Sequence, residues 1–167
     1  MGACATTGRV RDYERMAQDV SALGDLGARM TGVIDLRWDR LSGNGVSWVG
    51  FYTRTPGSEQ MTLGARRDKP ACSPIGLHGA CGRSLLSRKS LVVTDVANLG
   101  AGYIACDPRD RSEVVVPLLD REGVCWGVLD VDSWEVNAFD PGDAAGLCRV
   151  LRAAGVIEMD PLGVEVV

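Results

Sequence analysis

The sequence has little histidine and no paired cysteine motif. Its 167 residues include one histidine, His78, and six cysteines, with no C-x-x-C pair among them. Structural zinc sites use cysteine and histidine clustered at such short spacings. A structural zinc site is therefore poorly supported, and His78 is most simply interpreted as a polar loop residue.

An excess of positive charge is also absent. The formal net charge is −4, so neither nucleic acid nor an acidic membrane surface is expected as the main partner. No apolar run approaches the roughly 20 residues that span a bilayer, and residues 1–16 lack the apolar core of a signal peptide. We therefore expect a cytoplasmic protein, a setting in which structural disulfides are rare.

The first residues fit a lipidation pattern that we do not favour. Gly2 and Thr6 satisfy the myristoylation motif M-G-x-x-x-[ST], and Cys4 offers a second position for acylation. Motifs this short often match by chance. Residues 1–9 are therefore predicted to form a flexible leader.

The composition that is present suits one globular domain. Apolar residues make up 46% of the chain and charged residues 24%, and both values are ordinary for a folded protein. The length fits a single core. We predict one domain at residues 10–155, followed by a C-terminal tail at residues 156–167.

Apolar residues at helical spacing predict four helices. These are residues 10–23, 25–41, 80–90 and 141–155. Gly24 is expected to separate the first two, with Asp25 as the N-cap of the second. Asp140 is expected to cap the last helix, with Pro141 as its first residue.

Runs of β-branched and aromatic residues predict five strands. These are residues 46–55, 59–65, 91–96, 113–120 and 124–133. Pro117 lies inside one of them and indicates an edge strand or a bulge, because proline has no N–H to donate. Tight hairpins connect most of the strands, so the sequence predicts an α+β domain with a mainly antiparallel sheet.

Two long loops contain candidate reactive thiols. Loops of about fifteen residues are uncommon in a compact domain and are usually functional; here they are residues 66–79 and 97–111. Cys72 and Cys106 lie inside these loops, and Cys81 directly follows the first. Three thiols able to converge suit either an attacking thiol with resolving partners or incidental cysteines.

The charges near these thiols do not decide between the two interpretations. Arg109 and Arg111 favour a Cys106 thiolate, whereas Asp107 and Asp110 oppose it. Cys81 stands at a helix start, where backbone dipoles favour a thiolate. The remaining pair, Cys125 and Cys148, lies in apolar-patterned segments and is expected in the core.

Asp130 and Asp132 share one face of a predicted strand with Val124, Trp126 and Val128. Either the strand emerges into solvent at this point, or the two carboxylates face a cavity and meet a cation, an ammonium group or a metal. Glu113, which opens the neighbouring predicted strand, is a candidate third member.

Aromatic residues of the first predicted strand divide between its two faces. Trp48 and Tyr52 share one face, and Phe51 takes the other. Core packing is the default interpretation, with Trp48 as a candidate wall of a small-molecule pocket.

Taken together, several segments resemble the free methionine-(R)-sulfoxide reductases, which are single GAF-domain enzymes. They are WVGFY (48–52), LG-x4-KPAC (63–72), ACG (80–82), DV (95–96), IACD (104–107), SEVVVPL (112–118), GVLDVDS (127–133) and FDPGDAAGL (139–147). Each segment is short, but their order and spacing are specific. The resemblance implies a GAF-like α+β fold whose mainly antiparallel sheet has about six strands flanked by helices, so one short strand is expected within a loop.

The resemblance also implies roles for individual residues. Cys106 corresponds to the nucleophile, Cys81 to the main resolving thiol and Cys72 to a second thiol that can pair with it. The implied substrate-binding residues are Glu113, Asp130, Asp132, Trp48 and Asp107. The acidic residues Glu113, Asp130 and Asp132 would hold the substrate's ammonium group and help protonate the sulfoxide oxygen.

The implied activity is reduction of free L-methionine-(R)-sulfoxide through a sulfenic acid and then an intramolecular disulfide. Thioredoxin would be the reductant, no metal or organic cofactor would be needed, and a homodimer is suggested. The alternative is a non-catalytic GAF module that binds a small ligand or senses redox state. Two departures affect the loops: Tyr103 stands where the family often has histidine, and residues 73–80 lack the usual basic residue.

Overall fold

The computed structural model describes residues 11–100, 103 and 105–167. The predicted leader, with Gly2 and Cys4, lies outside these residues. The helices are α1 (Tyr13–Asp19), α2 (Leu26–Leu41), α3 (Ala80–Ser87), the 3-10 helix η1 (Val96–Leu99) and α4 (Pro141–Ala153). The strands are β1 (Trp48–Thr53), β2 (Gln60–Arg67), β3 (Ile75–Gly76), β4 (Ser90–Val93), β5 (Ser112–Leu119), β6 (Cys125–Ser133) and β7 (Val164–Val166).

The strands form one seven-stranded sheet in the order β3-β2-β1-β6-β5-β4-β7. Every neighbouring pair is antiparallel except β4 and β7, which confirms the predicted α+β class. The short strand expected within a loop is β3, inside residues 66–79. The seventh strand, β7, lies in the predicted tail, so that segment is part of the sheet. Three residues are too few for a pattern to reveal them.

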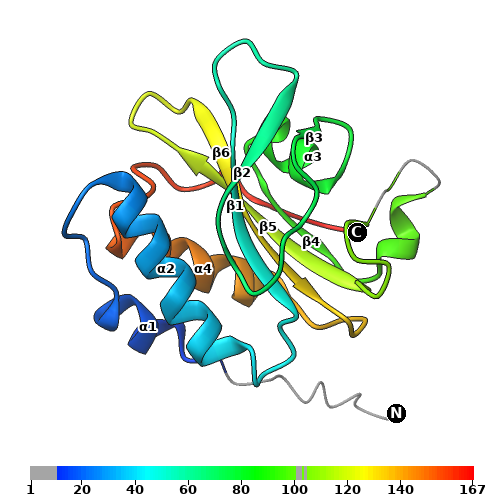
Figure 1. The fold of residues 1–167 in the computed structure, drawn as a ribbon, viewed down its shortest axis with the longest axis horizontal. Coiled ribbons are helices and arrows are strands. Elements are labelled where there is room, and N and C mark those ends of the chain that lie inside the picture. Colours follow the sequence, from blue (N-terminus) through cyan, green and yellow to red (C-terminus); the bar gives the residue numbers. More distant parts are fainter. Residues whose placement is uncertain (1–10, 101–102, 104) are drawn as a thin grey trace.

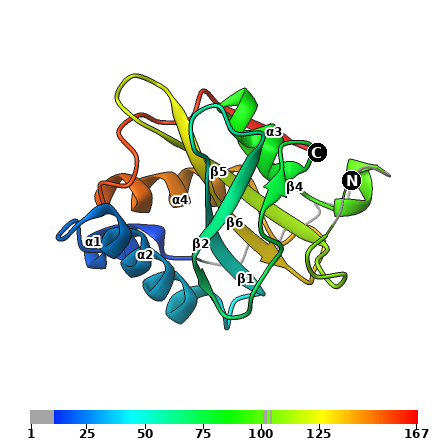
Figure 2. The same cartoon turned by 45° about the horizontal axis from the view of Figure 1, so that its top comes forward.

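The sheet separates two layers, as Figures 1 and 2 show. Helices α1, α2 and α4 cover one face, where the larger hydrophobic cluster contains Phe51 and Leu129. Helix α3 and the loops beside it cover the other face, where a smaller cluster contains Trp48, Tyr52 and Cys81. The predicted division of the β1 aromatic residues between two faces is confirmed.

Pro117 does not mark an edge strand. β5 lies between β6 and β4, and its pairing with β4 ends at Leu91↔Val115, two residues before Pro117. The missing N–H therefore interrupts none of the recorded β4–β5 pairs. A register shift does occur one residue further on, where Leu118 pairs with Gly127 and Leu119 with Cys125.

That shift changes the face of Trp126. Strict alternation would place Trp126 beside Val128, but the irregularity adds a residue to β6 at this point. Trp126 packs against the cluster under α1, α2 and α4, whereas Val128 belongs to the opposite cluster. The predicted apolar face of β6 is therefore wrong at this residue.

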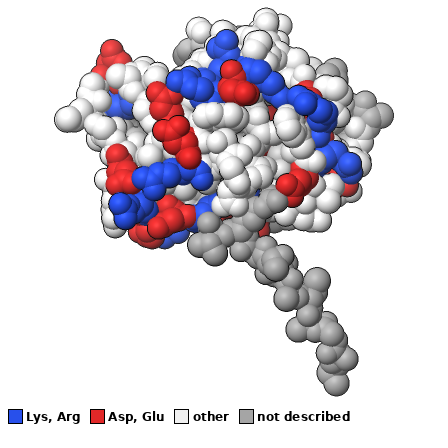
Figure 3. Space-filling model, turned by 60° about the horizontal axis from the view of Figure 1, so that its bottom comes forward, with Lys and Arg blue, Asp and Glu red and all other residues white. Residues whose placement is uncertain are grey.

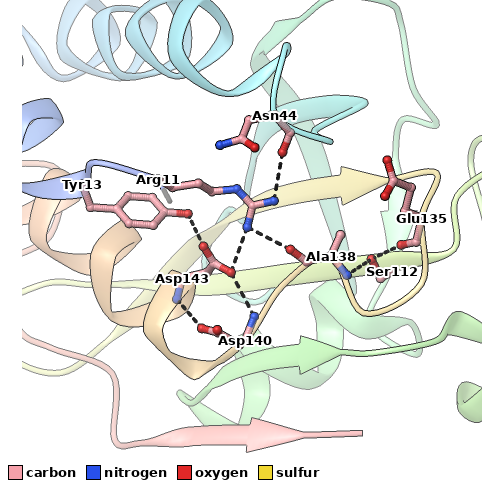
Figure 4. A network of polar contacts seen from close by, with 8 residues as sticks. All are labelled: Arg11, Tyr13, Asn44, Ser112, Glu135, Ala138, Asp140 and Asp143. Atoms are coloured by element: carbon pink, nitrogen blue, oxygen red, sulfur yellow. Dashed lines mark hydrogen bonds and ion pairs between the residues drawn. The ribbon is translucent and has the colours of Figure 1, made fainter. Parts of the chain in front are cut away.

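A buried carboxylate ties the N-terminal segment to α4 (Figure 4). Asp143 accepts a hydrogen bond from the Tyr13 hydroxyl at 2.7 Å and pairs with the Arg11 guanidinium at 2.9 Å. Arg11 also donates to the carbonyls of Ala138 and Asn44. Asp140 caps α4 as predicted, in a reciprocal capping box with Asp143. These contacts join the N-terminal segment to the turn after α2, to the loop before α4 and to α4 itself.

Basic and acidic side chains are interleaved on the face that Figure 3 presents, consistent with the modest net charge. Within the described ranges, no helix is both long and apolar enough to cross a membrane.

Candidate active site

Three neighbouring strands bring a set of polar and aromatic residues to the α3 face of the sheet. Trp48 on β1 pairs with Asp132 on β6, which in turn pairs with Glu113 on β5. One step along, Gly50 pairs with Asp130. Since side chains two residues apart share a face, Asp130 and Asp132 lie side by side with Glu113 next to them. One carboxylate oxygen from each of these three residues lies within 4.8 Å of the others.

These carboxylates face a cavity and not bulk solvent. The cavity has a volume of about 230 Å³ and includes all three carboxylates in its lining. Glu113 is 3% exposed and Asp130 is 7% exposed. Of the two interpretations that the sequence left open for Asp130 and Asp132, the structure shows the cavity.

Burial and mutual repulsion keep protons on this cluster. Burial raises the pKa of Glu113 to about 8, with the Asp132 charge adding to the effect. Burial likewise raises the pKa values of Asp130 and Asp132 well above the usual range. One oxygen of Glu113 and one of Asp130 are buried without a hydrogen-bond partner. Such a cluster is suited to accept a cation or to give up a proton.

The three loop-associated cysteines line the same cavity. Cys72, Cys81 and Cys106 are all free thiols. Cys81 is buried at the start of α3, and its Sγ donates to Asp130 Oδ2 at 3.3 Å. Burial and the Asp130 charge raise the pKa of Cys81 well above its usual value, so the expected stabilisation of a thiolate by the helix start is wrong for this arrangement. Adjacent carboxylates outweigh the dipole of a two-turn helix.

Cys106 is an exposed residue beside the cavity. Partial burial of its thiol raises the pKa of Cys106 to about 12, and the neighbouring Cys72 thiol contributes. The nearby arginines are paired elsewhere: Arg109 with Asp107 at 2.9 Å, and Arg111 with Asp95 at 3.8 Å. The sequence left open whether the nearby charges favour the Cys106 thiolate; in this arrangement partial burial and the pairing of both arginines favour the neutral thiol.

The pattern of the GAF domain family matches residues 25–157. The chain belongs to the GAF domain family.

Among its relatives are free methionine-R-sulfoxide reductases. The Saccharomyces cerevisiae reductase is 39% identical over 110 residues, which are 64% of this chain and 60% of that protein; the match thus spans less than two thirds of its length. The crystal structure of the Neisseria meningitidis reductase in complex with its substrate is 28% identical, covers 86% of each chain and superposes with a TM-score of 0.72. A putative GAF sensor protein from Burkholderia vietnamiensis is as similar, at 34% identity over 85% of this chain and 87% of its own, with a TM-score of 0.73.

Aromatic residues form one wall of the cavity in this GAF domain. Trp48 and Tyr52 both line it, with ring centroids 6.1 Å apart. Trp48 Nε1 donates to the Lys69 carbonyl at 3.0 Å, and the Tyr52 hydroxyl donates to the Cys72 carbonyl at 2.9 Å. The Trp48 ring lies directly over Gly50, where a Cβ atom would come within 2.2 Å of it. Both aromatic residues therefore hold the cysteine-bearing loop as well as line the cavity.

Sequence reasoning missed several lining residues. Asp110 is 5% exposed, accepts a hydrogen bond from Ser47 Oγ at 3.4 Å, and lines the cavity as a fourth carboxylate. Burial, with the Asp107 charge, raises the pKa of Asp110 to about 6. His78, to which no role was given, also lines the cavity. No local pattern marks either residue, because loop backbone brings both of them in.

Tyr103 is another residue of the site whose role was not predicted from the sequence. Tyr103 departs from the family pattern, yet it lines the cavity beside Glu113. Its interaction with Glu113 partly opposes the rise in the pKa of that carboxyl group. The departure thus falls within the candidate site, beside one of its acids.

Asp107 lines a hollow next to the main cavity, and Trp48, Cys106 and Asp132 line both. Asp107 itself does not line the 230 Å³ cavity but only this adjoining hollow of about 260 Å³. Its carboxylate is engaged by Arg109 and Lys69; these contacts hold its pKa well below the usual range.

Cys125 and Cys148, expected in the core, are partly buried and pack against the two hydrophobic clusters, one on each face of the sheet.

Proposed function

We propose that this protein reduces free L-methionine-(R)-sulfoxide to methionine, with Cys106 as the nucleophile. The observation that carries the proposal is the lining of one cavity, in which four buried or half-buried carboxylates face three free thiols. The likeness to free methionine-R-sulfoxide reductases supports it.

The carboxylates explain selectivity for a free amino acid. Glu113 and Asp130 each hold a buried oxygen without a partner, and such atoms favour a cationic group that can donate hydrogen bonds. Free methionine sulfoxide carries an α-ammonium group, whereas the same residue within a polypeptide does not. Trp48 and Tyr52 would pack against the apolar part of the side chain.

The same carboxylates would drive the first chemical step. An ammonium group bound by these carboxylates brings a positive charge into the cavity that Cys106 lines, so substrate binding favours the thiolate. Cys106 Sγ attacks the sulfoxide sulfur, and a protonated carboxyl group of the cluster gives its proton to the sulfoxide oxygen. Methionine leaves with its sulfur reduced by two electrons, and Cys106, oxidised by two, becomes a sulfenic acid.

The contacts support Cys72 as the thiol that resolves this sulfenic acid. The Cys72 thiol interacts with the Cys106 thiol and raises its pKa, whereas Cys81, the main resolving thiol expected from the resemblance, donates to Asp130. Attack of Cys72 on the sulfenic sulfur forms a disulfide and releases water. Cys81 could then enter by thiol–disulfide exchange.

A dithiol reductant would close the cycle by reducing the disulfide. We expect thioredoxin in this role and a cytoplasmic setting. A homodimer stays an expectation from the resemblance.

The test is a coupled assay with free methionine-(R)-sulfoxide, thioredoxin, its reductase and a reduced nicotinamide, followed by nicotinamide oxidation. Cys106→Ser should abolish turnover, while Cys148→Ser, a matched change on the opposite face of the sheet, should leave it within about twofold. Residual activity of Cys106→Ser would show that the nucleophile is a different residue. Absence of turnover by the unaltered protein would refute the reductase.

Mass spectrometry of the product disulfide separates the two resolving thiols. Cys72→Ser should leave a sulfenic acid that dimedone traps, and Cys81→Ser should still form the Cys72–Cys106 disulfide. The reverse pattern would assign resolution to Cys81.

A redox sensor is the second candidate, favoured by the Cys72–Cys106 contact and by the likeness to a putative GAF sensor protein. A sensor would form the disulfide under peroxide without releasing methionine from its sulfoxide.

A further inference from the structure

We propose that Lys69 and Asp107 form a clasp that holds the Cys72 loop against the Cys106 loop, and that Asp107 is a positioning residue and not a ligand of the substrate. The consequence for catalysis rests on the proposed function above. The geometric claim, that the clasp sets how readily Cys72 and Cys106 pair, does not.

The clasp joins the two loops close to their cysteines. Lys69 precedes Cys72 by three residues, and Asp107 directly follows Cys106. The Lys69 ammonium group contacts Asp107 Oδ2. Among the ion pairs of the described chain, this is the one that bridges the two loops.

Neighbouring groups hold both partners in place. Arg109 donates to both oxygens of Asp107 through its side chain, at 3.1 Å and 2.9 Å, and its backbone N–H donates as well. The Trp134 ring lies under both cations, with Lys69 Nζ 5.2 Å and the Arg109 guanidinium carbon 4.1 Å from its centroid. The Asp107 side chain is only 12% exposed. An ion pair shielded on one side by an aromatic ring is stronger than a free surface pair.

The Lys69 side of the clasp is itself attached to the sheet. Trp48 holds the Lys69 carbonyl and Tyr52 holds the Cys72 carbonyl, so the Cys72 loop is fastened to β1 at both positions. The ion pair extends this attachment to the Cys106 loop. Cys72 and Cys106, which line the same cavity, are thereby kept near one another, which raises the effective concentration of each thiol toward the other.

The clasp explains why Asp107 is unavailable to substrate. Its two oxygens already accept from Lys69 and Arg109, and it lines the adjoining hollow, which shares Asp132 with the main cavity but includes neither Glu113 nor Asp130. Its role is carried out through the loop that positions Cys106.

The test is the equilibrium of the Cys72–Cys106 disulfide in glutathione redox buffers, measured on the full chain by alkylation and peptide mapping. One glutathione disulfide oxidises the two thiols and leaves as two glutathione molecules, so no methionine sulfoxide is involved. Lys69→Met keeps the apolar stem over Trp134 but removes the charge. We expect it to lower the equilibrium constant for Cys72–Cys106 disulfide formation about fivefold, which is the contribution expected of an ion pair of this kind. Lys69→Arg should restore the wild-type value to within twofold.

The control is Arg111→Met, which removes a cation from the same loop that pairs with Asp95 and not across the loops. It should leave the equilibrium within twofold. An unchanged equilibrium constant for the disulfide in Lys69→Met would overturn the clasp. So would an equal fall of that constant in Lys69→Arg. Thermal unfolding of each variant shows whether a fall comes from general loss of structure, and the arginine variant keeps the test decisive if Lys69→Met unfolds.

The disulfide equilibrium tests the clasp independently of the reductase proposal. Loss of pairing in Lys69→Met without turnover in the unaltered protein would support the clasp and refute the reductase. If turnover is present, Lys69→Met should lower kcat and accumulate dimedone-trapped sulfenic acid, with KM within twofold of wild type, because resolution and not binding is slowed. A rise in KM alone would return Asp107 and its partners to the substrate site.

Discussion

Replacing Glu113 by glutamine should make the protein more stable at alkaline pH. Glu113 is 3% exposed, and burial with the charge of Asp132 raises its pKa from 4.5 to about 8. Because its pKa is raised on folding, the folded state holds more protons than the unfolded state between these two values. The free energy of unfolding of the wild type must therefore fall as pH rises through this interval.

The size of the effect follows from the shift. A tenfold change in proton affinity corresponds to about 1.4 kcal/mol, so Glu113 accounts for a loss of about 5 kcal/mol from below pH 4.5 to above pH 8. Glutamine cannot ionise, has nearly the same shape, and keeps a carbonyl oxygen that can accept hydrogen bonds. Since the Glu113 charge also raises the pKa of Asp130, the measured difference includes that coupling.

The assay is urea unfolding of both proteins at intervals from pH 5 to pH 9. The wild-type curve should fall more steeply, and Glu113→Gln should be the more stable protein at pH 9. Glu59→Gln, a change of the same kind at an exposed position, should reproduce the wild-type slope. Parallel curves for the wild type and Glu113→Gln would refute the reasoning, since they would mean that Glu113 ionises in the folded protein as freely as in water.

Two further changes test other parts of the structure. Gly50→Ala places a Cβ atom 2.2 Å from the Trp48 ring, so the ring must leave its place on the cavity wall. The KM for methionine sulfoxide should therefore rise about tenfold. An unchanged KM would show that Trp48 is not part of the binding site. Asp143→Asn leaves Arg11 buried without its counter-ion and should lower the free energy of unfolding by about 3 kcal/mol. Tyr13→Phe removes one hydrogen bond to the same carboxylate and should lower the free energy of unfolding by about 1 kcal/mol. Equal losses of the two variants in urea unfolding would contradict this ranking.

Local patterns in the sequence determined much of the fold. Helix caps at Asp25 and Asp140 could be predicted because a capping side chain bonds to backbone two or three residues away. Alternation along a strand was enough to place Asp130 with Asp132 and Trp48 with Tyr52. These features depend on residues that are close together in the sequence, so the sequence alone is enough to predict them.

Features that depend on contacts between distant segments could not be predicted from local sequence patterns. β7 joins the sheet only because it reaches β4, and Trp126 changes face only because β6 has an irregular register with β5. Both follow from pairing between strands, which periodicity within one strand does not report.

The same division applies to the site. The sequence was sufficient to single out Cys72, Cys81 and Cys106 and the acids Glu113, Asp130 and Asp132. Only the tertiary structure decided that these residues line one cavity, that Asp110 and Tyr103 join them, and that Asp107 does not. Strand order β1-β6-β5 and two loops folded over one face produce this arrangement, and burial there decides which groups hold their protons, because the cost of a charge depends on the surroundings that the fold creates.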